Sequence, residues 1–153
     1  MDHAQKAREL FKQGYNCSQA VVLAFSDLTG LDEKTAAMLS SSFGGGMGRM
    51  REVCGAVSGM FMVIGMLYGY DDPKETTGKA AHYARLQALA AKFREENGSI
   101  ICRELLGLGA GASVPVPEAR TETYYKKRPC ADMVESAARM TEAYILEQES
   151  NAD

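Results

Sequence analysis

The sequence predicts an all-α fold, a compact bundle of about six to eight helices built as one domain over residues 1–153. The apolar residues are mainly unbranched: 21 Ala and 9 Met stand against a total of 19 Val, Ile and Thr, which favours helix over sheet. Almost every segment boundary carries a helix cap or a glycine stop, and no strand candidate exceeds three or four residues. The stretch 50–69 is apolar on every face, so we expect it to form the central, covered helix.

Polar caps and glycines define the first three predicted helices. Apolar residues at spacings of three and four indicate an amphipathic helix over 3–13, which Gly14 ends. Asn16 caps a second helix that stops at Gly30, and Asp32 caps a third, short one. This part of the chain is therefore predicted to hold three helices joined by short turns.

A glycine-rich loop at 43–49 separates these helices from the rest, because repeated glycines make a helix costly. Pro73 fits the first turn of a long helix that Gly98 closes. Ser99 and Pro129 begin two further helices. The helices predicted after the loop are 50–69, 73–96, 100–106 and 129–148, with a flexible loop at 107–117.

Charge and hydropathy exclude several classes of partner. The net charge is −3, which leaves no basic surplus for binding nucleic acid. Residues 53–70 lack a charge over 18 positions, but four glycines and two tyrosines favour a buried helix over a membrane span. Residues 1–13 show no secretion signal, which predicts a cytoplasmic protein. The oligomeric state stays open, a homodimer included.

The four cysteines carry the chemical information; they are Cys17, Cys54, Cys102 and Cys130. No two of them have the C-x-x-C spacing of zinc ribbons or thioredoxins. Each lies near a predicted helix start, where free N–H groups and the helix dipole favour the thiolate. Arg51 precedes Cys54 on the same predicted helical face, and Lys127 and Arg128 directly precede Cys130. The alternative is that the cysteines are small buried hydrophobic residues.

Residues 54–59, Cys-Gly-Ala-Val-Ser-Gly, fit the pattern C-G-A-x-x-G. With one cysteine before this motif and two after it, the chain resembles the C-GCAxxG-C-C family of redox-active proteins from about Gly14 to about residue 140. The segments 16–20 and 43–48 are also typical of that family, and all four family cysteines map onto the four present here. The resemblance implies a small helical bacterial protein with a redox role, often encoded near transporter genes. It supplies no substrate.

The motif glycines, Gly55 and Gly59, are four residues apart and flank Ala56, so another backbone can approach this face closely. Two interpretations stay open. The glycines pack the core tightly, or they make room for a second cysteine or an inorganic cluster beside Cys54.

The loop FGGGMGRMR resembles an anion cradle, because it combines backbone N–H groups, a helix start and guanidinium groups. It lacks the Lys-Ser/Thr pair and the preceding strand of a nucleotide-binding loop. The competing interpretation is a hinge that turns the chain into the central helix. The candidate anion- or substrate-binding residues are Gly44, Gly45, Gly46, Gly48, Arg49 and Arg51. His82 is interpreted as a surface or core residue, and 124–128 as a solvated connector.

Three functions stay open. The first is a thiol–disulfide redox protein acting on an unknown small molecule or protein partner, a thiol-based oxidoreductase. The second is a metal-binding protein with zinc or an iron–sulfur cluster on Cys17, Cys54, Cys102 and Cys130. The third is a helical interaction module associated with a transport system.

Within the redox interpretation, we expect Cys54 to be the nucleophile and Cys17 to resolve. Cys102 and Cys130 would then be a second pair or complete a four-thiol site. Arg51 and the N–H groups of the glycine loop favour a thiolate at Cys54, whereas burial opposes it. The assignment therefore requires that solvent reach Cys54.

Overall fold

The computed structural model describes residues 2–152, so residues 1 and 153 of the predicted domain lie outside it. The described chain is helical apart from turns, loops and one isolated antiparallel bridge between Val53 and Ile101, which confirms the all-α prediction. The helices are α1 (His3–Lys12), α2 (Cys17–Ala24), α3 (Ser26–Thr29), α4 (Glu33–Ser40), the 3₁₀ turn η1 (Ser41–Phe43), α5 (Gly44–Met47), α6 (Gly55–Tyr68), α7 (Thr76–Asn97), α8 (Cys102–Leu105), α9 (Glu122–Lys127) and α10 (Cys130–Ala152). None of these helices is both long and apolar enough to cross a membrane.

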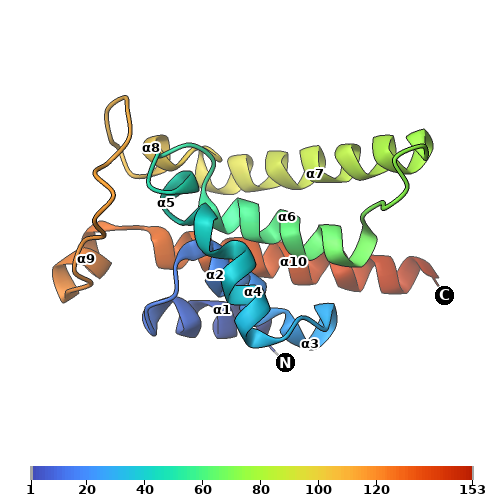
Figure 1. Ribbon diagram of the computed structural model, residues 1–153, viewed down its shortest axis with the longest axis horizontal. Coiled ribbons are helices and arrows are strands. Elements are labelled where there is room, and N and C mark those ends of the chain that lie inside the picture. Colours follow the sequence, from blue (N-terminus) through green and yellow to red (C-terminus); the bar gives the residue numbers. More distant parts are fainter. Residues whose placement is uncertain (1, 153) are drawn as a thin grey trace.

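Helix α6 lies at the centre of the bundle. Figure 1 shows it between α7 and α10, and α2 and α10 pack closely against it. Met60 and Ile64 are fully buried, as expected for a helix that is apolar on every face. The cover is thinner on other faces, since Phe61 and Met62 are only half-buried and Met66 is 50% exposed. The expected close cover therefore holds at Ile64 and only in part at Phe61 and Met62.

The start of α6 differs from the prediction. The helix begins at Gly55 rather than at residue 50, because Arg49 and Arg51 have φ angles of 65° and 62°, which are incompatible with a right-handed helix. Arg51 and Cys54 therefore do not share a helical face, and that prediction is wrong.

Several other boundaries are shifted. The predicted second helix is interrupted at Phe25, whose ψ of 17° separates α2 from α3. Helix α7 begins at Thr76, where the Glu75 carboxylate accepts a hydrogen bond from the backbone N–H of Gly78. Helix α8 begins at Cys102, and α10 continues beyond the predicted end at residue 148. The fold class is unaffected by these shifts.

Helices α2 and α6 approach each other closely at the motif glycines. A Cβ atom on Gly59 would lie 2.8 Å from the carbonyl oxygen of Ser18, and one on Gly55 would lie 3.1 Å from the Cβ of Cys17. The predicted close approach of a second backbone is therefore confirmed. The same contact brings Cys17 next to Gly55, the residue that follows Cys54. The absence of a side chain at Gly55 therefore allows both the tight helix packing and the approach of a second cysteine.

Candidate functional site

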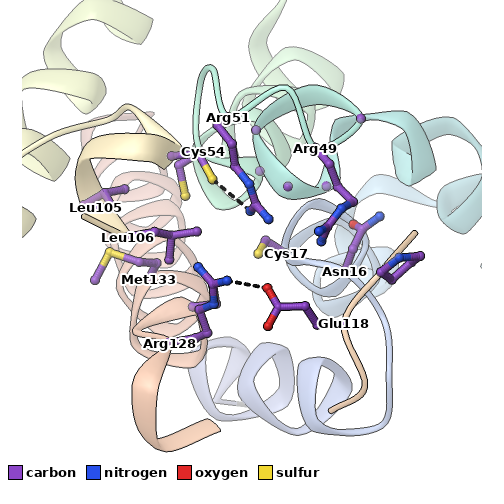
Figure 2. A pocket seen from close by; sticks show the side chains of 18 of the residues that line it. Asn16, Cys17, Arg49, Arg51, Cys54, Leu105, Leu106, Glu118, Arg128 and Met133 are labelled. Atoms are coloured by element: carbon purple, nitrogen blue, oxygen red, sulfur yellow. Dashed lines mark hydrogen bonds and ion pairs between the residues drawn. The ribbon is translucent and has the colours of Figure 1, made fainter. Parts of the chain in front are cut away.

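The four cysteines occupy four helix starts. Cys17, Cys102 and Cys130 are the first residues of α2, α8 and α10, and Cys54 is the N-cap of α6. All four line one cavity of about 290 Å³, whose surroundings are drawn in Figure 2. The structure thus brings together residues that are far apart in the sequence.

A capping box fixes Cys17 at the start of α2. The side-chain oxygen of Asn16 accepts a 2.9 Å hydrogen bond from the backbone N–H of Gln19, and the Gln19 side chain accepts one of 3.1 Å from the backbone N–H of Asn16. Asn16 Nδ2 also donates to the carbonyl of Ser41 at 3.0 Å. A Cβ on Gly44 would lie only 2.4 Å from the Asn16 side chain. The cap and the glycine loop therefore fit together only with glycine at position 44.

A short antiparallel pairing places Cys54 and Cys102. The backbone N–H of Cys54 donates to the carbonyl of Ile100 at 2.7 Å, and that of Cys102 donates to the carbonyl of Glu52 at 2.6 Å. The two cysteines are therefore diagonal neighbours on one face of the pairing. Both are buried, with 5% and 7% of their surface exposed. We call Cys54 and Cys102 the inner pair.

Cys17 and Cys130, which we call the outer pair, are half-buried. A hydrogen bond from Cys17 lowers the pKa of Cys130 from 9.0 to about 7 with the help of the guanidinium groups of Arg128 and Arg51, although burial opposes this. The same hydrogen bond, together with burial, raises the pKa of Cys17 well above its ordinary value. The Cys130 thiol therefore loses its proton easily, whereas the Cys17 thiol keeps its proton.

In the inner pair, burial favours the neutral thiol. It raises the pKa of Cys54 from 9.0 to about 12. It also raises the pKa of Cys102, although Nη1 of Arg51 donates to the sulfur of Cys102 at 3.5 Å (Figure 2). Arg51 is thus directed at Cys102 rather than at Cys54. These positions argue against Cys54 as a thiolate at neutral pH, contrary to the sequence-based expectation.

Four arginines line the cavity with the cysteines; they are Arg49, Arg51, Arg120 and Arg128. Arg128 forms an ion pair with Glu118 (Figure 2). Arg120 donates to the main-chain carbonyls of Phe11 and Tyr15, and its guanidinium lies 4.2 Å from the centre of the Phe11 ring. Arg120 and Glu118 could not be identified as site residues from the sequence, because no local motif links them to the cysteines.

Arg49 and Arg51 hold the neighbouring loop over the cavity. Nε of Arg49 donates to the carbonyl of Val114 at 2.7 Å, and Nε of Arg51 donates to the hydroxyl of Ser113 at 2.8 Å. The backbone N–H of Ser113 donates in return to the carbonyl of Arg49 at 2.9 Å. The loop predicted at 107–117 therefore contributes to the cavity wall.

The predicted anion cradle lies at this cavity, since its lining includes Gly44, Gly45, Gly46, Gly48, Arg49 and Arg51. Gly45 and Gly46 have φ angles of 67° and 69°, so they turn the chain as a hinge would. A Cβ on Gly46 would lie 2.6 Å from the Cβ of Cys102. The loop is consequently both a turn and a wall of the cavity.

The stretch 124–128 is not a solvated connector, and that prediction is wrong. Most of it forms α9, and the ring of Tyr125 packs edge-on against Phe11 of α1. Tyr124 lines the cavity, and burial raises its pKa to about 12. The packing of α9 on α1 turns this segment toward the cysteines.

Within residues 2–152, no three Cys, His, Asp or Glu side chains are grouped so that they could hold a metal ion. His82 is buried and does not line the cavity. Its Nδ1 lies 3.0 Å from Nη1 of Arg85, so the ring accepts a hydrogen bond there. This agrees with its interpretation as a core residue.

The helices and the cavity define a class of protein: an all-α protein in which four cysteines from distant segments face one arginine-lined space. The family model described as putative redox-active protein (C_GCAxxG_C_C) matches residues 15–144. The chain therefore belongs to this family, as the motif at 54–59 and the four cysteines predict. No curated protein and no solved structure matches it.

Proposed function

We propose that the protein performs thiol–disulfide redox chemistry, with Cys130 as the nucleophile and Cys17 as the resolving thiol. The outer pair carries the proposal, because both thiols line the cavity and the interaction with Cys17 helps to lower the pKa of Cys130 to about 7. The redox-active description of the family agrees with this chemistry. The proposed nucleophile is thus Cys130 instead of Cys54, which the sequence had indicated, and Cys17 remains the resolving thiol.

The pKa values favour Cys130 over Cys54. At pH 7 a thiol with a pKa of about 7 is about half thiolate, whereas one with a pKa of about 12 is about one part thiolate in 10⁵. The thiolate is the attacking species in thiol–disulfide exchange. Cys54 is also 5% exposed, so a substrate reaches it less easily.

The proposed reaction with a disulfide substrate R–S–S–R′ takes two steps. The Cys130 thiolate attacks one sulfur, forms a mixed disulfide and releases R′–S⁻. Cys17 gives its proton to the departing thiolate and attacks the sulfur of Cys130, which releases R–S⁻. The substrate gains two electrons, and the protein ends with a Cys17–Cys130 disulfide. We place this chemistry in the cytoplasm, where a thiol or dithiol reductant returns the disulfide to two thiols.

The two alternative functions have less support. A tetrathiolate zinc or iron–sulfur site needs four deprotonated sulfurs around one point. The described residues contain no group of three or more such side chains placed to hold one ion. An interaction module with inert cysteines gives no reason for four arginines to line the same cavity as the thiols.

Disulfide mapping tests the proposal. The protein is prepared without oxygen, treated with one equivalent of diamide, alkylated, digested and analysed by mass spectrometry. The expected first disulfide joins Cys17 to Cys130, both in the natural protein and in the matched control Cys54→Ser. A first disulfide that contains Cys54 or Cys102, or stoichiometric iron or zinc in the purified protein, would overturn the proposal.

A further inference from the structure

Arg51 is a buried cation without a carboxylate partner. Its surface is 6% exposed, and no Asp or Glu of residues 2–152 forms an ion pair with it. Its bonded neighbours are the Ser113 hydroxyl and the sulfur of Cys102, which burial keeps as a neutral thiol. Burying a cation without a carboxylate partner is costly, and the Cys130 thiolate, which Arg51 favours, is only partly formed at neutral pH. This guanidinium therefore favours a further anion from outside the chain.

Arg49 is a second arginine of the cavity whose guanidinium has N–H groups that are not bonded to the described chain. Of its side-chain nitrogens, only Nε is bonded to the described part of the chain, at the carbonyl of Val114. The other two arginines are already committed, Arg128 to Glu118 and Arg120 to two main-chain carbonyls. In Figure 2, Arg49 and Arg51 both descend from the glycine loop toward the space above Cys17. The uncommitted donors therefore lie on one wall of the cavity.

The backbone of the glycine loop is arranged to aim these two side chains. Arg49 and Arg51 both have positive φ angles, a conformation that costs free energy in residues other than glycine and that recurs at functional sites. A Cβ on Gly45 would lie 2.9 Å from Cγ of Arg49 and 3.9 Å from Nη1 of Arg51. Glycine at position 45 thus leaves the space that the aliphatic part of the Arg49 side chain occupies.

The wall opposite Arg49 carries three apolar side chains next to Arg128, which is paired with Glu118. The three are Leu105, Leu106 and Met133, and in Figure 2 they lie across the cavity from Arg49. A volume of about 290 Å³ is at the small end for ligand pockets, which favours a small molecule over a polypeptide. A cationic wall facing apolar side chains fits a ligand with one charged end.

We propose that the cavity binds a small organic anion with an oxyanionic head and an apolar body. Arg49 and Arg51 hold the carboxylate, sulfonate or phosphate head, and the body lies against the leucines and Met133. This inference rests on the proposed function in one respect only: it makes the redox substrate a low-molecular-weight disulfide that carries such a head. Binding itself needs neither Cys130 nor Cys17.

Calorimetric titration of the double variant Cys17→Ser/Cys130→Ser tests binding apart from redox chemistry. The probes are hexane-1-sulfonate, 1-hexanol and inorganic phosphate. We expect hexanesulfonate to bind at least tenfold more tightly than either of the others, because only hexanesulfonate has both a charged head and an apolar body. Equal affinity for hexanesulfonate and hexanol, or for hexanesulfonate and phosphate, overturns the inference.

Substitutions locate the head group. In the same double-serine background, Arg51→Gln and Arg49→Gln each weaken hexanesulfonate binding about tenfold or more. Arg139→Gln, which removes an exposed arginine that pairs with Glu96 away from the cavity, leaves it unchanged. Far-UV circular dichroism and thermal melting check folding, and Arg49→Gln keeps the test valid if loss of Arg51 unfolds the chain. Unchanged binding in both cavity variants overturns the inference. Binding as expected alongside a natural protein that forms no Cys17–Cys130 disulfide would defeat the proposed function alone.

Discussion

Cys130 of the outer pair and Cys54 of the inner pair place the same chemical group at the same kind of position, and their pKa values are shifted in opposite directions. Cys130 begins α10 and has a pKa of about 7, whereas Cys54 caps α6 and has a pKa of about 12. A helix start supplies about 0.3–1 kcal/mol in favour of the thiolate. Raising the pKa of Cys54 from 9.0 to about 12 corresponds to about 4 kcal/mol against it.

Solvent access and hydrogen-bond donors therefore outweigh the helix dipole. Cys130 is half-buried, accepts a hydrogen bond from Cys17 and has guanidinium groups nearby. Cys54 is buried, and only backbone hydrogen bonds favour its thiolate. A cysteine at a helix start is reactive when a donor and solvent reach it, and otherwise behaves as a small core residue.

The largest expected effect separates the two pairs directly. Cys130→Ser removes the only strongly acidic thiol, so we expect its second-order reaction rate with a small disulfide at pH 7 to fall at least about 100-fold. Cys54→Ser, the matched control, changes the rate less than about threefold. Stopped-flow absorbance with 4,4′-dithiodipyridine measures both. A comparable loss in the two variants would remove the distinction between the pairs.

A substitution at Gly55 tests the contact between the pairs. A Cβ there would lie 2.9 Å from the carbonyl oxygen of Phe43 and 3.1 Å from the Cβ of Cys17. We expect Gly55→Ala to lower the free energy of unfolding by about 1–3 kcal/mol, because α2 and α6 must separate. A Cβ on Gly109 would have no heavy atom of another part of the chain within 4 Å, so Gly109→Ala should leave the free energy of unfolding nearly unchanged. Urea unfolding compares them, and equal stability of the two variants would contradict the packing described here.

Cys54 and Cys130 also predict opposite dependence of stability on pH. The folded pKa of Cys54 lies above its ordinary 9.0, so its contribution is complete below pH 9 and is lost as the pH rises toward 12. That loss amounts to about 1.4 kcal/mol for each pH unit above 9. The contribution of Cys130, whose folded pKa is lowered, is instead present above pH 9 and lost as the pH falls through about 7.

Urea unfolding of the reduced protein between pH 8 and pH 10.5 measures these slopes. Cys54→Ala should flatten the alkaline fall in the free energy of unfolding, and Cys130→Ala should steepen it. An unchanged slope in Cys54→Ala would show that its thiol is not desolvated.

A finer comparison ranks the groups that make Cys130 acidic. The hydrogen bond from Cys17 has the largest effect on its pKa, and Arg128 is the first of the cations. We expect Cys17→Ala to slow alkylation of Cys130 at pH 7 about tenfold and Arg128→Gln to slow it about threefold. Arg139→Gln serves as the control. The reverse order, read by peptide mass spectrometry, would assign the acidity to charge rather than to the thiol partner.

Much of the fold can be predicted from local signals in the sequence. Asn16 and Asp32 cap α2 and α4 as expected, because a capping side chain acts within its own turn. The cap at Asn16 also places Cys17 at the start of α2, whereas α6, whose N-cap is Cys54, and α8, which begins at Cys102, have no capping side-chain hydrogen bond. The glycines at positions 55 and 59 indicate the close contact between α2 and α6 through their spacing alone.

The chemistry of the site depends on contacts that no local signal encodes. The outer pair joins Cys17 to Cys130 across most of the chain, and Arg120 reaches the cavity from a loop. The positive φ angles of Arg49 and Arg51 have no sequence signature, because neither residue is a glycine. A helix that began at residue 50 would place Arg51 beside Cys54, whereas the observed loop directs Arg51 to Cys102.

Alkylation of the four cysteines across pH tests the central claim most directly. The reduced, natural protein is treated with iodoacetamide for fixed times between pH 5 and pH 9, and the rate at each cysteine is read by peptide mass spectrometry. Cys130 should react fastest, with a half-maximal rate near pH 7, while Cys54 stays unmodified throughout this range. A Cys54 that reacts as fast as Cys130, or a Cys130 that reacts only above about pH 8.5, would contradict the account.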